Sequence, residues 1–215
     1  MSEAAPGLPD PAKFSTGERA RLAEAARGLL DAVITLGDVP AAEIDAAASV
    51  IHDVTRRLGG NDKPAGAGYR PTHPLDRLPR SPFVGEANPV SPPAEWDVRG
   101  ERVHATVTFG PIYEGPPGYV HGGFIAMAFD ELLGLTNSQL GRPGMTGTLS
   151  IKYRNPTPLH REVRLESWVE RMEGRRVVIR GELRHDDTLC AEAEGLFVAL
   201  RPEVAAAYFA HITEA

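Results

Sequence analysis

The stretch that decides the fold is 118–134, GYVHGGFIAMAFDELLG. It has a helical pattern and is apolar on every side, through Phe124, Ile125, Met127, Phe129, Leu132, Leu133 and the following Leu135. A helix of that kind is normally buried. Yet it starts with a histidine and two glycines and holds a carboxylate, Asp130, in its middle. A buried charge needs a partner or a function.

The segments around this helix alternate between apolar and polar residues, the period of two that is typical of strands. Six such runs occur, at 94–98, 103–109, 148–154, 162–172, 176–185 and 189–200. Turn signals separate several of them, at Arg99-Gly100, Glu173-Gly174 and 185–187. Strands joined by tight turns are antiparallel. The sequence therefore predicts an α+β fold, in which an antiparallel sheet curls around one central helix.

Two amphipathic helices are predicted ahead of this region. The first has a capping box at Ser15 and Glu18 and a stop at Gly37. The second runs from about Pro40 to the Gly59-Gly60 pair. Together they form a helical hairpin that is too small for a core of its own, so we expect it to pack on the sheet domain as a cap or lid.

The chain is expected to divide into five parts. Eight prolines between Pro64 and Pro93 argue against a sheet interior there. The predicted division is a disordered N-terminus at 1–13, the helical hairpin at 14–60, a Pro-rich linker at 61–81, the sheet domain at 82–203 and a C-terminal tail at 204–215.

Composition excludes several classes of function. The net charge of −6 argues against a nucleic-acid-binding protein. There is no apolar run of the roughly 18 residues that a membrane span needs, and the N-terminal residues do not resemble a secretory signal. The seven histidines are scattered without a metal motif, so no metal or cofactor is expected. Cys190, the single cysteine, should be a packed and inert thiol. A cytoplasmic location is expected.

The start of the central helix carries the first chemical signal. Its first backbone N–H groups lack internal partners and can stabilise a carbonyl oxygen that becomes negative. Asp130 follows Gly123 by seven residues, on nearly the same helix face but about 10 Å further along. One substrate carbonyl cannot contact both groups on one helix. The spacing therefore predicts a site shared by two subunits, one giving the amide and the other Asp130.

Two alternatives remain for the acids of this helix. Asp130 could be a structurally paired carboxylate or could lie at an exposed position. Glu131 points about 100° away around the helix, and we expect it to be solvated or salt-bridged.

The residues 114–134, EGPPGYVHGGFIAMAFDELLG, resemble the hotdog-fold acyl-CoA thioesterases of the PaaI-like and Them4-like branch. The shared pattern is Gly-Pro-Pro-Gly at 115–118, then His121-Gly122-Gly123, then an acid nine residues after the histidine, Asp130. Residues 145–159 and 169–183 resemble the next strands of that family. The similarity covers about residues 82–201, and it says nothing of residues 1–80.

The resemblance implies roles for individual residues. Asp130 would be the general base that activates water, or a nucleophile. The N–H of Gly123 would bind the oxyanion, with His121 and Gly122 shaping the helix start. Thr146 would orient the attacking water, with Thr148 beside it.

Coenzyme A in this family is held by basic side chains near the dimer surface. Lys152, Arg154 and Arg175 are the candidates, and solvated strand-edge charges are an equally good interpretation. We therefore expect an acyl-CoA thioesterase that acts as a homodimer or a dimer of dimers. The rival hypothesis is a non-catalytic module that binds or senses acyl-CoA.

Overall fold

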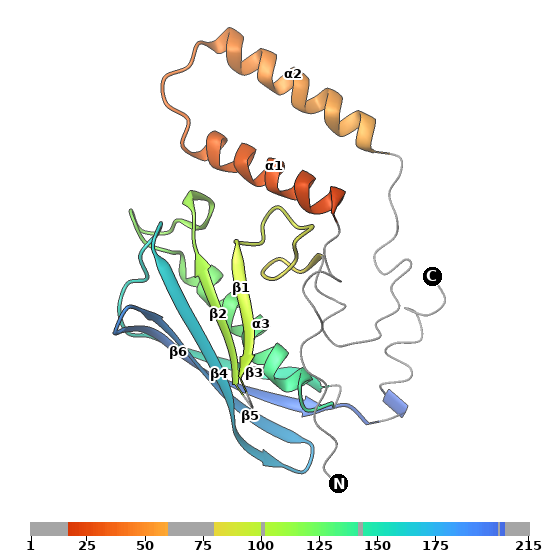
Figure 1. The fold of residues 1–215 in the computed structure, drawn as a ribbon, viewed down its shortest axis with the longest axis vertical. Coiled ribbons are helices and arrows are strands. Elements are labelled where there is room, and N and C mark those ends of the chain that lie inside the picture. Colours follow the sequence, from red (N-terminus) through yellow and green to blue (C-terminus); the bar gives the residue numbers. More distant parts are fainter. Residues whose placement is uncertain (1–16, 60–79, 100–101, 142–143, 202, 205–215) are drawn as a thin grey trace.

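The computed structural model describes residues 17–59, 80–99, 102–141, 144–201 and 203–204 (Figure 1). The predictions made for 1–13, for most of the linker and for nearly all of the C-terminal tail lie outside these residues. The elements in chain order are α1 (Glu18–Ile34), α2 (Ala41–Leu58), β1 (Ala94–Arg99), β2 (Arg102–Thr108), the short 3₁₀ helix η3 (Pro111–Tyr113), α3 (Gly122–Ser138), β3 (Gly144–Tyr153), β4 (Glu162–Glu173), β5 (Arg176–His185) and β6 (Thr188–Ala199).

The strands form one six-stranded antiparallel sheet in the order β1-β2-β4-β5-β6-β3. Strand β3, which follows the central helix, pairs with the last strand β6 and so forms one edge of the sheet. The sheet curls around α3, which contacts strands β2 to β6 (Figure 1). This is the hotdog architecture expected from the sequence, with two helices added at the N-terminus.

Alternation along the strands places the core between sheet and helix. Phe129, Leu132 and Leu133 of α3 are fully buried against it. A glycine in β6 lets the helix approach closely, because a Cβ at Gly195 would lie only 3.0 Å from Leu133 and 2.8 Å from the Phe197 ring. The free thiol of Cys190 is buried, as predicted.

The ends of the N-terminal helices differ in part from the prediction. Helix α1 begins after Gly17, which has no side chain to cap it, and Ser15 lies outside the described residues. It ends at Ile34 with Thr35 as C-cap, before the predicted stop at Gly37. Helix α2 ends as predicted, with Gly59 as its C-cap.

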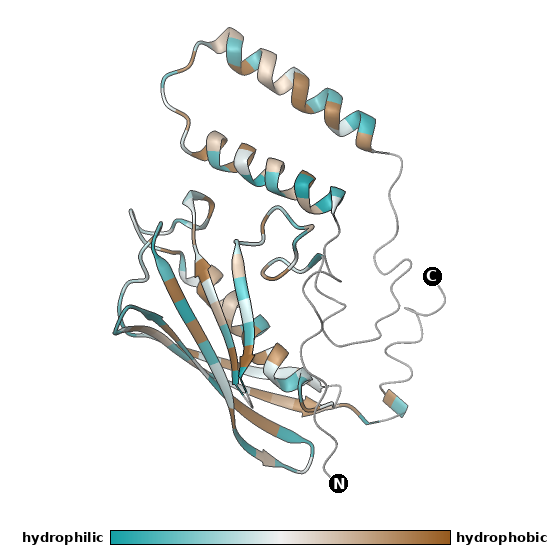
Figure 2. Cartoon of the chain, viewed as in Figure 1, coloured by the Kyte–Doolittle hydropathy of each residue, from teal (hydrophilic) through white to brown (hydrophobic). Residues whose placement is uncertain are grey.

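Only α1 contacts the sheet domain closely. Arg27 donates from Nε to the Ser91 carbonyl at 2.9 Å, and Ala23 is buried. Helix α2 buries none of its residues. Figure 2 shows that hydrophobic and hydrophilic residues alternate along both helices. Large apolar side chains of the two helices and their connection are exposed: Leu22, Leu29, Val33, Ile34, Leu36, Ile44, Val50, Ile51, Val54 and Leu58. None of the helices in the described ranges is long and apolar enough to cross a membrane.

Candidate active site

A tight loop fixes the start of α3. His121 is the N-cap, and its Nδ1 accepts a hydrogen bond from the Gly123 N–H at 3.0 Å. The preceding Gly115 lies flush against it, since a Cβ there would lie 2.7 Å from the His121 Cα. Gly118 has a φ of +81°, which favours glycine, and its N–H donates to the Glu114 carboxylate at 2.7 Å. The two glycines of the Gly-Pro-Pro-Gly motif thus position His121.

Strand β3 fixes the same helix start from the other side. The Tyr153 hydroxyl donates to the Gly122 carbonyl at 2.9 Å. Its ring lies where a Cβ at Gly122 would make contact, at 3.4 Å. Tyr153 was not among the predicted site residues. The sequence offers one signal for it: alternation within 148–154 places Tyr153 on the same strand face as Leu149 and Ile151.

Asp130 lies on an open face of α3. Its carboxylate Oδ1 accepts a hydrogen bond from Thr146 Oγ1 at 3.1 Å. His121, Gly123 and Asp130 are all exposed in the single chain. The prediction that this helix is buried on every side is therefore wrong: one stripe, from the predicted oxyanion amide to the predicted base, is open. Within one chain Asp130 carries little burial cost, and no partner charge is needed to explain it.

Thr148 points away from this pair, contrary to expectation. A β-bulge interrupts the pairing of β3 with β6, so that Thr146 lies opposite Phe197 and Thr148 lies opposite Leu196. Directly opposite residues share a sheet face. Phe197 belongs to the core, which puts Thr146 on the inner face and Thr148 on the outer face.

The three basic candidates do not form one cluster in the chain. Arg154 and Lys152 both pair with Glu192, at 2.5 and 3.8 Å. The hydrogen bond from Arg154, with the nearby cations, lowers the pKa of the Glu192 carboxyl. Arg175 instead donates to the Ala199 carbonyl, seven positions along β6 from Glu192, or about 24 Å at 3.4 Å per residue.

Glu131 is the acid that the structure partly buries. Its Oε2 accepts a hydrogen bond from Ser81 Oγ at 3.0 Å. Burial raises the pKa of the Glu131 carboxyl, the Ser81 bond opposes that rise and the Asp130 charge adds to it. The expectation of a solvated or salt-bridged Glu131 is wrong, and this half-buried acid is adjacent in sequence to the exposed one.

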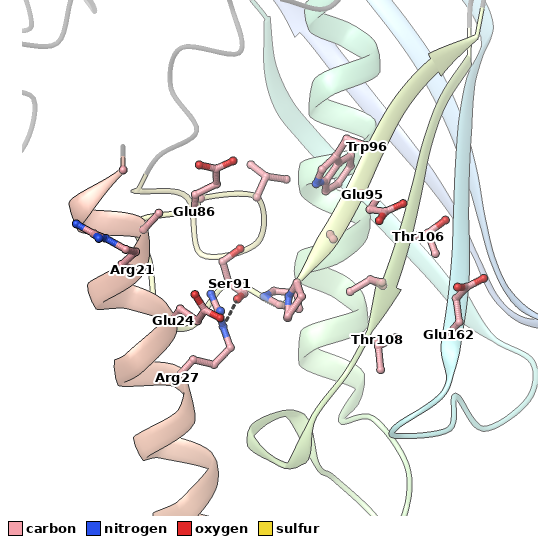
Figure 3. A pocket seen from close by; sticks show the side chains of 18 of the residues that line it. Arg21, Glu24, Arg27, Glu86, Ser91, Glu95, Trp96, Thr106, Thr108 and Glu162 are labelled. Atoms are coloured by element: carbon pink, nitrogen blue, oxygen red, sulfur yellow. Dashed lines mark hydrogen bonds between the residues drawn. The ribbon is translucent and has the colours of Figure 1, made fainter. Parts of the chain in front are cut away.

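A cleft of about 910 Å³ lies between α1 and strands β1 and β2 (Figure 3). Its charged lining comprises Glu18, Arg21, Glu24, Arg27, Glu86, Glu95 and Glu162. Arg27 is already held by the Ser91 carbonyl. Acids outnumber bases, which disfavours an anionic ligand such as coenzyme A, and none of the predicted site residues lines the cleft. We therefore place the candidate site at the open face of α3.

Within the ranges that the structure covers, no three His, Cys, Asp or Glu side chains are grouped so that they could hold a metal ion. The open face of α3 offers a carboxylate with a hydroxyl beside it and a helix start with its backbone amides. A water molecule activated by the carboxylate and an oxyanion held by an amide suit attack on an acyl carbonyl.

Comparison with known proteins agrees with this fold. Residues 117–192 match the model of the thioesterase superfamily. The crystal structure of the thioesterase superfamily protein RHA08564 is 30% identical and superposes with a TM-score of 0.75 over 84% of this chain and 94% of that one. The chain belongs to the thioesterase superfamily. Because residues 82–215 make up less than two thirds of the sequence, the superposition must also include part of the N-terminal segment.

Curated relatives match a shorter segment. The acyl-coenzyme A thioesterase THEM4 of Xenopus laevis is 43% identical over 95 residues, which cover 43% of each chain. THEM4 of Bos taurus is 40% identical over 96 residues, 44% of this chain and 39% of its own. The chain thus matches only about two fifths of the length of these relatives.

Proposed function

We propose that this protein hydrolyses an acyl-CoA thioester to the free acid and coenzyme A. The observation that carries the proposal is the exposed Asp130 carboxylate with the Thr146 hydroxyl on it, on the same open helix face as the Gly123 amide. The relatives named acyl-coenzyme A thioesterases support the choice of substrate.

The proposed reaction begins with a water molecule at Asp130. Thr146 holds one carboxylate oxygen, so the other is free to accept the proton of the water as its oxygen attacks the thioester carbonyl. The Gly123 N–H stabilises the tetrahedral oxyanion. When the intermediate collapses, the C–S bond breaks and coenzyme A leaves as the thiolate. A variant in which the carboxylate attacks directly, as nucleophile, uses the same residues.

The amide is engaged in the structure as it stands. Gly123 donates its N–H to His121 Nδ1, so an oxyanion has to displace or share that acceptor. A negatively charged oxygen is a stronger acceptor than a neutral imidazole nitrogen, and we propose that the His121 ring yields the N–H during the reaction.

Two subunits are proposed to form each site. The separation of seven positions from Gly123 to Asp130 corresponds to about 10 Å along the helix, too far for one carbonyl. A partner helix facing the open stripe would bring its own Asp130 toward this Gly123, as a homodimer or within a dimer of dimers. The acyl chain would lie in an apolar slot beside α3.

Coenzyme A is proposed to contact Lys152, Arg154 and Arg175. Because the first two share Glu192 and the third lies at the other end of β6, they would serve one ligand only if the assembly brings them together. A cytoplasmic location and the absence of a cofactor remain predictions.

A panel of acyl-CoA thioesters, read by release of free thiol, tests the proposal. Short, medium, long and aryl acyl groups should be included, because nothing in the sequence selects among them. We expect multiple turnovers with at least one class. Saturable binding of these thioesters without thiol release would instead support the non-catalytic binding module.

A further inference from the structure

One peptide unit at the start of α3 is held at both of its polar ends. Its carbonyl, on Gly122, accepts a hydrogen bond from the Tyr153 hydroxyl at 2.9 Å. Its N–H, on Gly123, donates to His121 Nδ1 at 3.0 Å. This N–H is the one that the proposed function assigns to the oxyanion. Tyr153 therefore contacts the carbonyl end of the same peptide unit whose N–H would bind the oxyanion.

The location of Tyr153 follows from the sheet register. Tyr153 lies opposite Ala191 of β6, a fully buried residue, and therefore points to the inner face. Being on the edge strand, it does not enter the core but reaches the first turn of the helix. The ring lies against Gly122, where a larger residue would be crowded. Because 54% of Tyr153 stays exposed, removal of its hydroxyl leaves the core unchanged.

We propose that Tyr153 is a positioning residue that orients and strengthens the Gly123 N–H as oxyanion donor. The inference rests on the proposed thioesterase function. A hydrogen bond to a peptide carbonyl fixes the plane of that peptide, and with it the direction of the N–H. It also polarises the amide, so that the N–H becomes a better donor, an effect of roughly 10–30% per bond in hydrogen-bonded chains.

Strand β3 would then position both the proposed base and the proposed oxyanion donor of its own chain. Thr146, near its beginning, holds the carboxylate of Asp130, and Tyr153, at its end, holds the peptide of Gly123. The strand runs antiparallel to the helix, so that these two contacts tie it to the two ends of the open stripe.

The test is Tyr153→Phe, which removes only the hydroxyl. Deleting an oxyanion donor outright lowers kcat by about 10²–10³, and the loss of its support should lower kcat by about 10-fold, with KM within about twofold. Tyr119→Phe, at an exposed tyrosine two residues before His121, is the matched control and should keep the wild-type kcat. Both variants should keep the wild-type Tm.

A second readout does not depend on turnover. In the ¹H–¹⁵N spectrum of the protein without substrate, Tyr153→Phe should shift the Gly123 amide proton upfield, and Tyr119→Phe should leave it in place. An inactive wild-type protein would refute the proposed function, while the amide shift would still test the contact. A wild-type kcat in Tyr153→Phe, a change confined to KM, or an unmoved Gly123 amide would each overturn the role of Tyr153.

Discussion

Thr146 donates its hydroxyl hydrogen to the Asp130 carboxylate at 3.1 Å, from the edge strand of the sheet to the open face of the central helix. The family resemblance had assigned both residues to the same step, the activation of water. The contact fixes the direction of a carboxylate that is otherwise exposed.

Asp130→Asn should lower kcat by roughly 10² to 10⁴ while the protein stays folded, because the amide cannot accept the proton of water. Steady-state thiol release and circular dichroism measure the two properties. Asp97→Asn, at an exposed acid that pairs with the neighbouring Arg99, is the control and should retain full activity. Wild-type turnover in the Asp130 variant would end its assignment as base or nucleophile.

Thr146→Val should lower kcat by roughly 10-fold, since one hydrogen bond to a charged group is lost while the shape is kept. The matched control is Thr148→Val, because the bulge turns Thr148 to the opposite sheet face. Equal losses in the two variants would show that the threonines act through strand stability, not through Asp130.

Mixed dimers test the shared site. Subunits with Asp130→Asn and subunits with Gly123→Val should each be inactive, the second because even a Cβ at Gly123 lies 3.1 Å from His121 Nδ1. In a mixed dimer one site would combine both defects and the other neither, so each mixed dimer should recover about half of the wild-type activity. If purified mixed dimers stayed inactive, a single chain would have to supply both groups.

Glu131→Gln should raise the Tm at pH 7. Burial raises the pKa of Glu131 in the folded state. The free energy of unfolding is therefore higher at low pH, where Glu131 is neutral, and it falls as the pH rises through that raised pKa. The glutamine stays neutral and can still accept from Ser81. The gain in Tm should therefore shrink as the pH falls toward about 4. A gain in Tm that does not depend on pH would contradict the explanation.

Deleting residues 1–60 should lower the Tm yet leave measurable hydrolysis. The deletion removes the α1 contacts to the 88–91 loop and uncovers part of the sheet domain, but none of the predicted catalytic residues. Arg27→Met should give a smaller loss of Tm, whereas Arg19→Met, at an exposed position of α1, should give none. A truncated protein with unchanged Tm would mean that the hairpin is a detached module, and a stable but inactive one would mean that it supplies part of the site.

Periodicity and turn chemistry were enough to predict the curled sheet and its central helix, because the strands alternate over most of their length and the register shifts are local. The sequence alone could not reveal the bulge in β3. A regular alternation would place Thr146 and Thr148 on the same sheet face. One extra residue in the strand puts them on opposite faces.

The open stripe on α3 was missed for a different reason. When apolar residues are counted around the helix, half-buried residues such as Met127 are assigned to the core. The curled sheet, however, covers only one side of the helix. Tyr153 and Ser81 were missed because their contacts, to Gly122 and Glu131, join positions 31 and 50 residues apart. No local pattern encodes contacts of that range.

The two edges of the sheet differ in how they resist aggregation. Edge strands expose unpaired backbone groups, and charged side chains along an edge discourage further strands from joining. Strand β1 carries exposed Glu95, Asp97 and Arg99, whereas the longer β3 has Lys152 as its one charged residue and exposes Met145 and Tyr153. Apart from Lys152, β3 carries no charge that would oppose pairing with another strand, so most of this edge is less protected than β1. A charged residue introduced at Ser150 would oppose the pairing of another strand with β3. Such a variant would show whether the solubility of the chain depends on self-association through this edge.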